Sequence, residues 1–178
     1  MSIPHRLSAE RLRQLLTYES ETGLFFWNVE SRSGFNDSVV NHLPGDEAGT
    51  PRKSDGRIVI RIEGRTYLRY RLAWLWMVGR WPTGEIDHRD GDPTNDKFEN
   101  LREATRMFNQ QNMRRPIKTK RSSKYLGVFA NKPGRSKPWR AAIQDRGRQI
   151  GLGAFATEEE ARDAYLSAKR RLHEGCTI

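Results

Sequence analysis

The sequence predicts an α+β fold in two parts, and three observations lead to that prediction. Alternating apolar and polar residues indicate short strands in both halves of the 178-residue chain, and leucines at helical spacing indicate helices among them. Residues 114–124, RRPIKTKRSSK, combine dense positive charge with no apolar periodicity. The residues that follow have a complete strand and helix pattern of their own. We therefore expect a first domain over residues 1–113, a basic linker over 114–122 and a second domain over 123–178.

The first predicted element is a short helix. Ser8 is a good N-cap residue for a helix over Ala9–Tyr18, whose three leucines fall on one side. TGLFFWN, residues 22–28, then reads as a strand after a glycine turn. Residues 30–56 are rich in Ser, Gly, Asn, Asp and Pro, which predicts a long loop.

A hairpin and a helix follow this loop. RIVIRIEGRTYLRY, residues 57–70, alternates β-forming residues around Glu63-Gly64, a typical two-residue turn. The pattern then changes to helical spacing through residues 69–78, with Gly79 in the position of a helix-ending glycine. Pro82 prevents the helix from continuing.

The second domain reads as three short strands and one helix. The strands are KYLGVFA, KPWRAAIQ and RQIGLGAFA, and the helix is TEEEARDAYLSAKRRLHEG. Thr157 with Glu160 three residues later forms a capping-box signature at the start of that helix. We expect its inward stripe to contain the following residues: Ala161, Ala164, Tyr165, Ala168 and Leu172.

Charge points to a polyanionic partner, nucleic acid first and an anionic membrane surface second. The net charge is +10 and the pI about 10.2. Thirteen basic residues and one acidic residue lie between Arg106 and Ile150, so that segment alone carries +12. The single cysteine, Cys176, excludes a disulfide framework and a cysteine-built zinc site. With no signal-peptide or transmembrane pattern, we expect a cytoplasmic protein that uses neither a membrane nor a small-molecule cofactor.

The candidate chemistry lies in EIDHRDGDPTNDKFENLREATRMFNQQN, residues 85–112. A calcium loop of EF-hand type fails, because a loop starting at Asp90 has Asn95 instead of glycine sixth and Leu101 instead of a carboxylate twelfth. An Asx-rich turn between two strands remains the simple alternative. Asp87-His88, however, joins a hard oxygen ligand for a divalent cation to the side chain best suited to general-base work.

Two asparagines fit the same interpretation. Asn100 opens a predicted second strand, NLREAT, from which its amide could orient the His88 ring. Asn109 falls on the helical segment that follows, where it could share one cation with Asp87. Since neighbours on a regular strand point to opposite faces, Asp87 and His88 must lie at a strand end or an irregular bend.

This block resembles the ββα-metal motif of HNH nucleases, specifically the phage and intron homing endonuclease branch. ETGLFFWN and RLAWLWMVGRWPTGEIDH also resemble flanks in that family. The resemblance implies that His88 is the base, that Asn100 orients it, and that Asp87 and Asn109 bind one Mg²⁺ or Mn²⁺. Its core covers residues 84–113 approximately. One departure is Tyr70, which stands where many relatives have histidine.

Residues 125–169 resemble an AP2 DNA-binding domain through YLGV, Trp139, Ala141, Ile143, LG, Phe155 and the TEEEA…AY helix. In that family the sheet lies in the DNA major groove. The resemblance implies DNA contact by Arg140 and Trp139. Further candidates are Arg135, Arg146 and Arg148, with Lys120 and Arg121 in the linker.

Together these features predict a metal-dependent endonuclease that hydrolyses phosphodiester bonds of double-stranded DNA, acting as a monomer or weak homodimer. One metal and one base cut one strand, so a monomer is expected to nick. The first alternative is a DNA-binding regulator that uses the nuclease fold as a scaffold. An RNA-binding protein comes third, because the exposed-aromatic motifs of RNA-binding modules are missing from the sequence.

Overall fold

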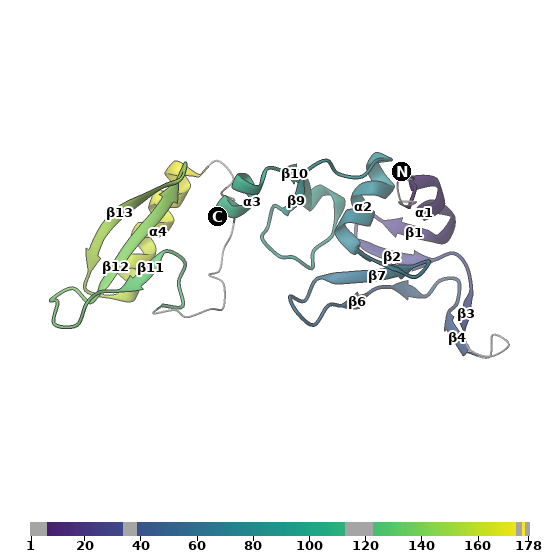
Figure 1. The fold of residues 1–178 in the computed structure, drawn as a ribbon, viewed down its shortest axis with the longest axis horizontal. Helices are drawn as coiled ribbons and strands as arrows, with labels where there is room; N and C mark the ends of the chain where they lie inside the picture. Colours follow the sequence, from purple (N-terminus) through teal and green to yellow (C-terminus); the bar gives the residue numbers. More distant parts are fainter. Residues whose placement is uncertain (1–6, 34–38, 113–122, 174–175, 177–178) are drawn as a thin grey trace, which may run out of the picture. The chain divides into compact units, whose positions relative to one another are not determined.

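The computed structural model describes residues 7–33, 39–112, 123–173 and 176. The chain divides into two compact units, Met1–Ala104 and Thr105–Ile178 (Figure 1). This division falls before the linker expected over residues 114–122, all of which lies outside the described residues. No helix in the described ranges has both the length and the apolar character of a membrane-spanning segment.

The first unit begins with helix α1 (Ala9–Leu15), which is shorter than expected. Ser8 caps it as predicted, since Ser8 Oγ accepts a hydrogen bond of 3.1 Å from Arg11 N. The helix ends because Leu16 is extended and starts strand β1 (Leu16–Glu19). β1 pairs antiparallel with β2 (Leu24–Trp27), which buries Leu16 in the core instead of continuing the helix.

The prediction of a loop over residues 30–56 was wrong in part, because this segment contains short strands. These are β3 (Ser31–Ser33), β4 (Val39–His42), β5 (Glu47–Ala48) and β6 (Thr50–Pro51). β3 pairs with β4, β5 with β2, and β6 with strand β7 (Ile58–Ile62). Segments of two to four residues are too short to show an alternating pattern in sequence. They form through backbone pairing with longer neighbours, and β5 buries Ala48 completely.

The hairpin and helix predicted over residues 57–79 are confirmed. Strands β7 (Ile58–Ile62) and β8 (Arg65–Leu68) are antiparallel, with Ile62 opposite Arg65. Glu63 and Gly64 both have positive φ, 48° and 79°, as a two-residue turn of type I′ requires. Helix α2 (Arg69–Val78) ends at Gly79, whose left-handed backbone lets its N–H donate to Leu75 O.

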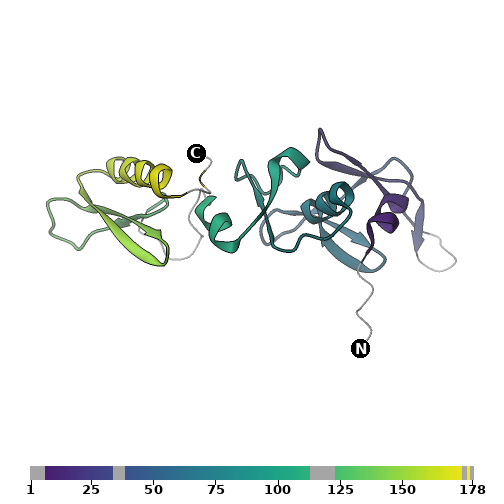
Figure 2. The ribbon, with the colours of Figure 1, turned by 90° about the horizontal axis from the view of Figure 1, so that it is seen from above.

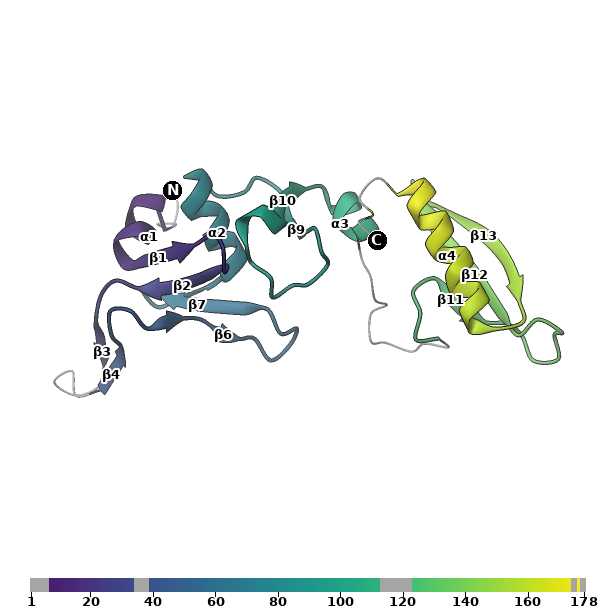
Figure 3. The same cartoon turned by 180° about the vertical axis from the view of Figure 1, so that it is seen from behind.

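The strand pair β9 (Glu85–His88) and β10 (Leu101–Ala104) completes the first unit. A 3₁₀ turn, η2 (Phe98–Asn100), leads into β10. Ile86 and Leu101 are each 4% exposed and belong to the same apolar core as α1, α2, β1 and β2. Phe98 packs on Trp74 of α2, with ring centroids 5.7 Å apart. Figure 3 shows β9 and β10 beside α2 from the opposite side of the molecule.

The second unit contains helix α3 (Arg106–Asn112) and a separate sheet and helix. The sheet has the predicted three antiparallel strands in the order β11 (Val128–Ala130), β12 (Trp139–Asp145), β13 (Arg148–Phe155). Helix α4 (Glu158–Leu172) covers one face of this sheet (Figure 2) and starts with the predicted Thr157–Glu160 capping box.

The inward stripe of α4 differs from the expected one at its end. Ala161, Tyr165 and Ala168 are buried as predicted and pack on Val128, Ala141 and Ile143 of the sheet. Ala164 is only half-buried. Leu172 is the last helical residue and is 38% exposed, whereas Lys169 is 1% exposed. The apolar stripe therefore covers fewer turns than the sequence suggested.

Gly127 should be essential to the second unit, because a methyl group there would lie 2.0 Å from the Tyr165 ring. Its φ of +70° adds the penalty of a left-handed backbone. We expect Gly127→Ala to lower the free energy of unfolding by about 3–5 kcal/mol in urea denaturation. Gly134→Ala is the matched control: φ is +81° but nothing lies within 4 Å, so about 1 kcal/mol is expected. Equal losses would contradict the packing argument.

Candidate functional site

Asp87 and His88 are the last two residues of β9, which confirms the expectation that they lie at a strand end. In the β9–β10 register Asp87 is opposite Arg102, and His88 is opposite Leu101. Both side chains are nearly buried, with Asp87 3% and His88 6% exposed. Buried polar side chains need partners, so the groups around them determine what they can do.

Asp87 is paired with an arginine directly across the sheet. Arg102 Nε and Nη2 lie 2.8 Å and 2.7 Å from Asp87 Oδ2. A cross-strand pair of opposite charge stabilises the β9–β10 register, and burial strengthens each of its hydrogen bonds. The sequence contained this signal in NLREAT, but Arg102 was not recognised as the partner of Asp87.

His88 is paired with Asp96, a residue that the sequence interpretation missed. His88 Nε2 lies 2.9 Å from Asp96 Oδ1, and Asp96 is 1% exposed. Arg69 at the start of α2 donates from Nε to the other oxygen, Asp96 Oδ2, over 2.8 Å. The same guanidinium donates to Thr94 O over 3.0 Å. Three side chains from α2, the β9–β10 loop and β9 thus form one buried chain of contacts.

Tyr70, which stands where many relatives of the resembled family have histidine, lies beside this chain. Its ring meets the His88 ring edge-on, with centroids 5.2 Å apart and an interplanar angle of 76°. Arg57 Nη1 donates to Tyr70 Oη over 2.9 Å. The Tyr70 ring therefore packs against the imidazole, and its hydroxyl accepts a hydrogen bond from the Arg57 guanidinium.

Asn100 was expected to orient His88, and that contact is not made. Its Oδ1 accepts from Asp90 N over 3.0 Å, and its Nδ2 donates to Asp90 Oδ1 and Asn95 O. The reason is its position in η2, one residue before β10 begins, from where the amide faces the loop. Asn100 fixes the β9–β10 loop, and Asp96 makes the contact with His88.

The loop is held together by hydrogen bonds between its own side chains and backbone, and Asn95 takes part in them. Asn95 Nδ2 donates to Asp90 Oδ2 over 2.6 Å, and Asp92 Oδ1 accepts from Thr94 N over 2.9 Å. Burial acts to raise the pKa of Asp90. The hydrogen bonds from Asp92 N, Asn95 and Asn100 outweigh it, so the pKa is lowered overall. The carboxylate therefore keeps its role as acceptor.

Asn109, the second expected metal ligand, lies on α3. α3 belongs to the second unit and Asp87 to the first, so the geometry of this pair stays a prediction. Among the described residues there is no group of three or more His, Cys, Asp or Glu side chains that could hold a metal. The expected ligands are Asp87 and Asn109, and His88 is expected to act as the base.

The basic residues expected to contact DNA lie in the second unit. Lys120 and Arg121 fall outside the described residues. Arg140 lies on the sheet face opposite α4, because its neighbour Ala141 is buried under that helix. Its Cζ is 5.3 Å from the ring centroid of Phe129, which is 37% exposed and was missed from sequence. The other three candidates are also exposed: Arg135, Arg146 and Arg148.

Trp139 differs from Arg140. It shares the side of β12 that carries Ala141, and it packs against the apolar cluster of the second unit. The ring is half-buried. Its contribution to the core is therefore established by its position, and its expected DNA contact stays a prediction.

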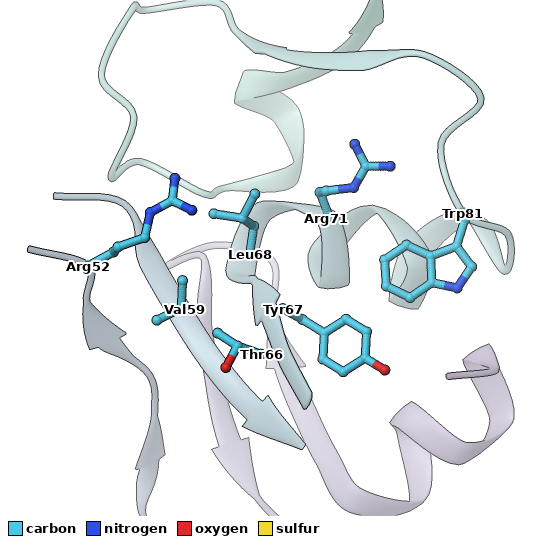
Figure 4. A pocket seen from close by; sticks show the side chains of 7 residues that line it. All are labelled: Arg52, Val59, Thr66, Tyr67, Leu68, Arg71 and Trp81. Carbon is cyan, nitrogen blue, oxygen red and sulfur yellow. The ribbon is translucent and has the colours of Figure 1, made fainter. Parts of the chain in front are cut away.

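A pocket of about 310 Å³ lies on the first unit (Figure 4), and neither Asp96 nor His88 lines it. Its lining combines two arginines with aromatic and apolar side chains: Arg52, Val59, Thr66, Tyr67, Leu68, Arg71 and Trp81. Leu68 and Arg71 line the pocket, whereas the two residues between them do not. Arg69 contacts Asp96, and Tyr70 contacts His88.

One comparison concerns the segment that contains α2, β9, β10 and α3. Residues 67–114 match the HNH endonuclease family model. This supports an HNH nuclease domain in that segment, which includes Asp87 and His88. The match does not extend to the β11–β13 sheet, so the AP2 resemblance stays a prediction. Comparisons with curated proteins and with solved structures gave no significant match.

The loop contacts of Asn100 generate a stability prediction. Asn100→Asp replaces an amide donor with a carboxylate that faces Asp90 and the Asn95 carbonyl. We expect the free energy of unfolding to fall by about 2–3 kcal/mol in urea denaturation. Asn131→Asp is the control, because Asn131 Nδ2 also donates to a carbonyl, that of Lys137, but at an exposed loop. A loss at Asn100 no larger than at Asn131 would contradict this role.

Proposed function

We propose that this protein is a metal-dependent endonuclease that hydrolyses phosphodiester bonds of double-stranded DNA. The observation that carries the proposal is the adjacent Asp87–His88 pair at the end of β9, inside the segment that matches HNH endonucleases. Both side chains are nearly buried and each has a defined partner. A fixed carboxylate beside a fixed imidazole offers a ligand and a base at one point.

His88 takes the proton from the water that attacks phosphorus. An imidazole is suited to this step because its ordinary pKa lies close to neutral pH. The Tyr70 ring packs on His88 and limits its rotation. These contacts hold the base in one orientation before substrate arrives, which lowers the entropic cost of the reaction.

Asp87 and Asn109 would hold one Mg²⁺ or Mn²⁺. The donor set fits, since Mg²⁺ commonly uses one or two carboxylates and completes its shell with water and substrate phosphate. When bound, the ion supplies positive charge to the phosphate oxygens in the transition state. Arg102 now neutralises Asp87, so it must share or release that carboxylate when the ion binds.

The second unit supplies most of the DNA affinity. Its basic side chains far outnumber its acidic ones between residues 106 and 150, which predicts a steep salt dependence. The helix-free face of its sheet presents Arg140 over the exposed Phe129 ring. An arginine stacked on an aromatic ring is held extended, ready to meet a base edge or a phosphate.

One base and one ion per chain cut one strand, so a monomer nicks and a double-strand break needs a weak homodimer or two binding events. The most specific parts of the proposal are the homing-endonuclease type and a phage origin. They rest on the sequence resemblance of residues 85–112 and their flanks.

The Asp87–Arg102 pair favours one second candidate, a DNA-binding regulator without catalysis. A carboxylate already neutralised by arginine is satisfied without a metal. In that case the β9–β10 fold serves only as a scaffold, and DNA binding persists without cleavage.

Plasmid nicking separates the two candidates. With Mg²⁺ we expect nicking by the wild type, none in EDTA, and a rate about 10²–10⁴-fold lower for His88→Ala with unchanged DNA affinity. His42→Ala is the control. The His42 ring stacks on Trp27, with ring centroids 3.7 Å apart, and His42 lies far from β9 in sequence. Wild-type protein that binds but never nicks would establish the regulator instead.

Arg140 provides the test of the DNA interface. Arg140→Ala should weaken binding to its DNA by about 1–3 kcal/mol and reduce the salt slope by about one. Arg171→Ala removes the same charge from exposed α4 and should change affinity little. Fluorescence anisotropy over a salt series measures both. Equal effects would show that only net charge matters.

A further inference from the structure

The buried carboxylate Asp96 has a more specific role than packing. We propose that Asp96 is a positioning residue that fixes the tautomer of His88, with Arg69 fixing Asp96 in turn. The inference rests on the proposed function for its catalytic meaning, but its structural content stands on contacts within the first unit. Each of the two carboxylate oxygens has one partner: Oδ1 lies 2.9 Å from His88 Nε2, and Oδ2 accepts from Arg69 Nε at 2.8 Å.

The direction of the His88 contact follows from chemistry. Arginine is a permanent cation, and a carboxylate paired with it can only accept hydrogen bonds. Nε2 of His88 must therefore carry the hydrogen and donate it to Asp96. In a neutral imidazole the lone pair is then on Nδ1, so Nδ1 is the nitrogen that takes a proton from water.

Asp96 is held by three elements that lie outside the strand pair itself. Arg69 comes from α2 and binds the side chain. Tyr18 on β1 donates from Oη to the Asp96 carbonyl over 2.7 Å, and burial raises the pKa of Tyr18, so the hydroxyl stays a donor. The β1–β2 turn closes the third side, because a methyl group on Gly23 would lie 2.7 Å from the Asp96 carbonyl carbon. Asp96 therefore has little freedom to move away from His88.

Asp96→Asn gives the sharpest test. Arg69 can only donate, so the new amide should turn its oxygen to Arg69 and its NH₂ to His88 Nε2. Nε2 must then accept, which moves the hydrogen to Nδ1 and blocks the base. Arg69→Met added to Asp96→Asn removes the donor that fixes the amide, so the amide can turn its oxygen to His88 Nε2 and the Nε2–H form should return in part.

The readout is the ¹⁵N chemical shifts of the His88 ring in the full chain at alkaline pH, assigned by comparison with His88→Ala. We expect the Nε2–H form in wild type, the Nδ1–H form in Asp96→Asn and a return toward Nε2–H in the double variant. Asp46→Asn is the charge-matched control, since Asp46 accepts from Leu43 N in an exposed loop, and it should keep the wild-type tautomer.

Cleavage assays on the same proteins give the second readout. We expect kcat to fall about 10²–10⁴-fold in Asp96→Asn with KM little changed, and to recover in part in the double variant. An Nδ1–H wild type would overturn the proposal even if Asp96→Asn did not fold. So would a folded Asp96→Asn with the wild-type tautomer. An Nε2–H wild type that cuts no DNA supports the positioning role and rejects the nuclease function.

Discussion

A carboxylate that is 1% exposed cannot remain charged without a partner, and this constraint on Asp96 organises the first unit. Arg69 supplies the opposite charge from the first turn of α2, and His88 uses the remaining oxygen. Removing one member of a buried ion pair commonly costs about 3–5 kcal/mol, because the other charge is left buried alone. The start of α2, the β9–β10 loop and the end of β9 are thus tied to one another by electrostatics as well as by the apolar core.

The second ion pair of the site joins Arg102 to Asp87, the proposed metal ligand. Arg102 neutralises Asp87 across the β9–β10 ladder, as Arg69 neutralises Asp96 across the loop. The two pairs have opposite consequences for chemistry. Arg69 makes Asp96 a fixed acceptor for the imidazole, whereas Arg102 competes with any cation for Asp87. If Asp87 binds a metal ion as proposed, metal affinity and the stability of the strand pair are linked through one carboxylate.

Much of the fold was predictable because its signals are local. The Glu63-Gly64 turn, the glycine after α2 and the capping box of α4 each depend on a few adjacent residues. α1 was predicted too long, since leucine spacing alone cannot show that Leu16 pairs with Trp27. The short strands between residues 31 and 51 likewise arise from pairing with distant partners.

The site was predictable to the extent that it is contiguous. Asp87-His88 and the placement of Asn109 on a helix could be read from residues 85–112. Arg69 and Asp96 lie 27 residues apart, and only tertiary structure brings them together. Asn100 was assigned the orienting contact because asparagine suits that role, but its position in a 3₁₀ turn directs the amide to Asp90.

The most direct test of the central claim is anomalous diffraction from crystals of the protein bound to a DNA duplex with Mn²⁺. We expect one manganese ion bonded to Asp87, Asn109 and an oxygen of the scissile phosphate, with His88 Nδ1 facing the attacking water and Nε2 still hydrogen-bonded to Asp96. A manganese peak elsewhere, or His88 turned so that Nε2 faces the phosphate, would contradict it.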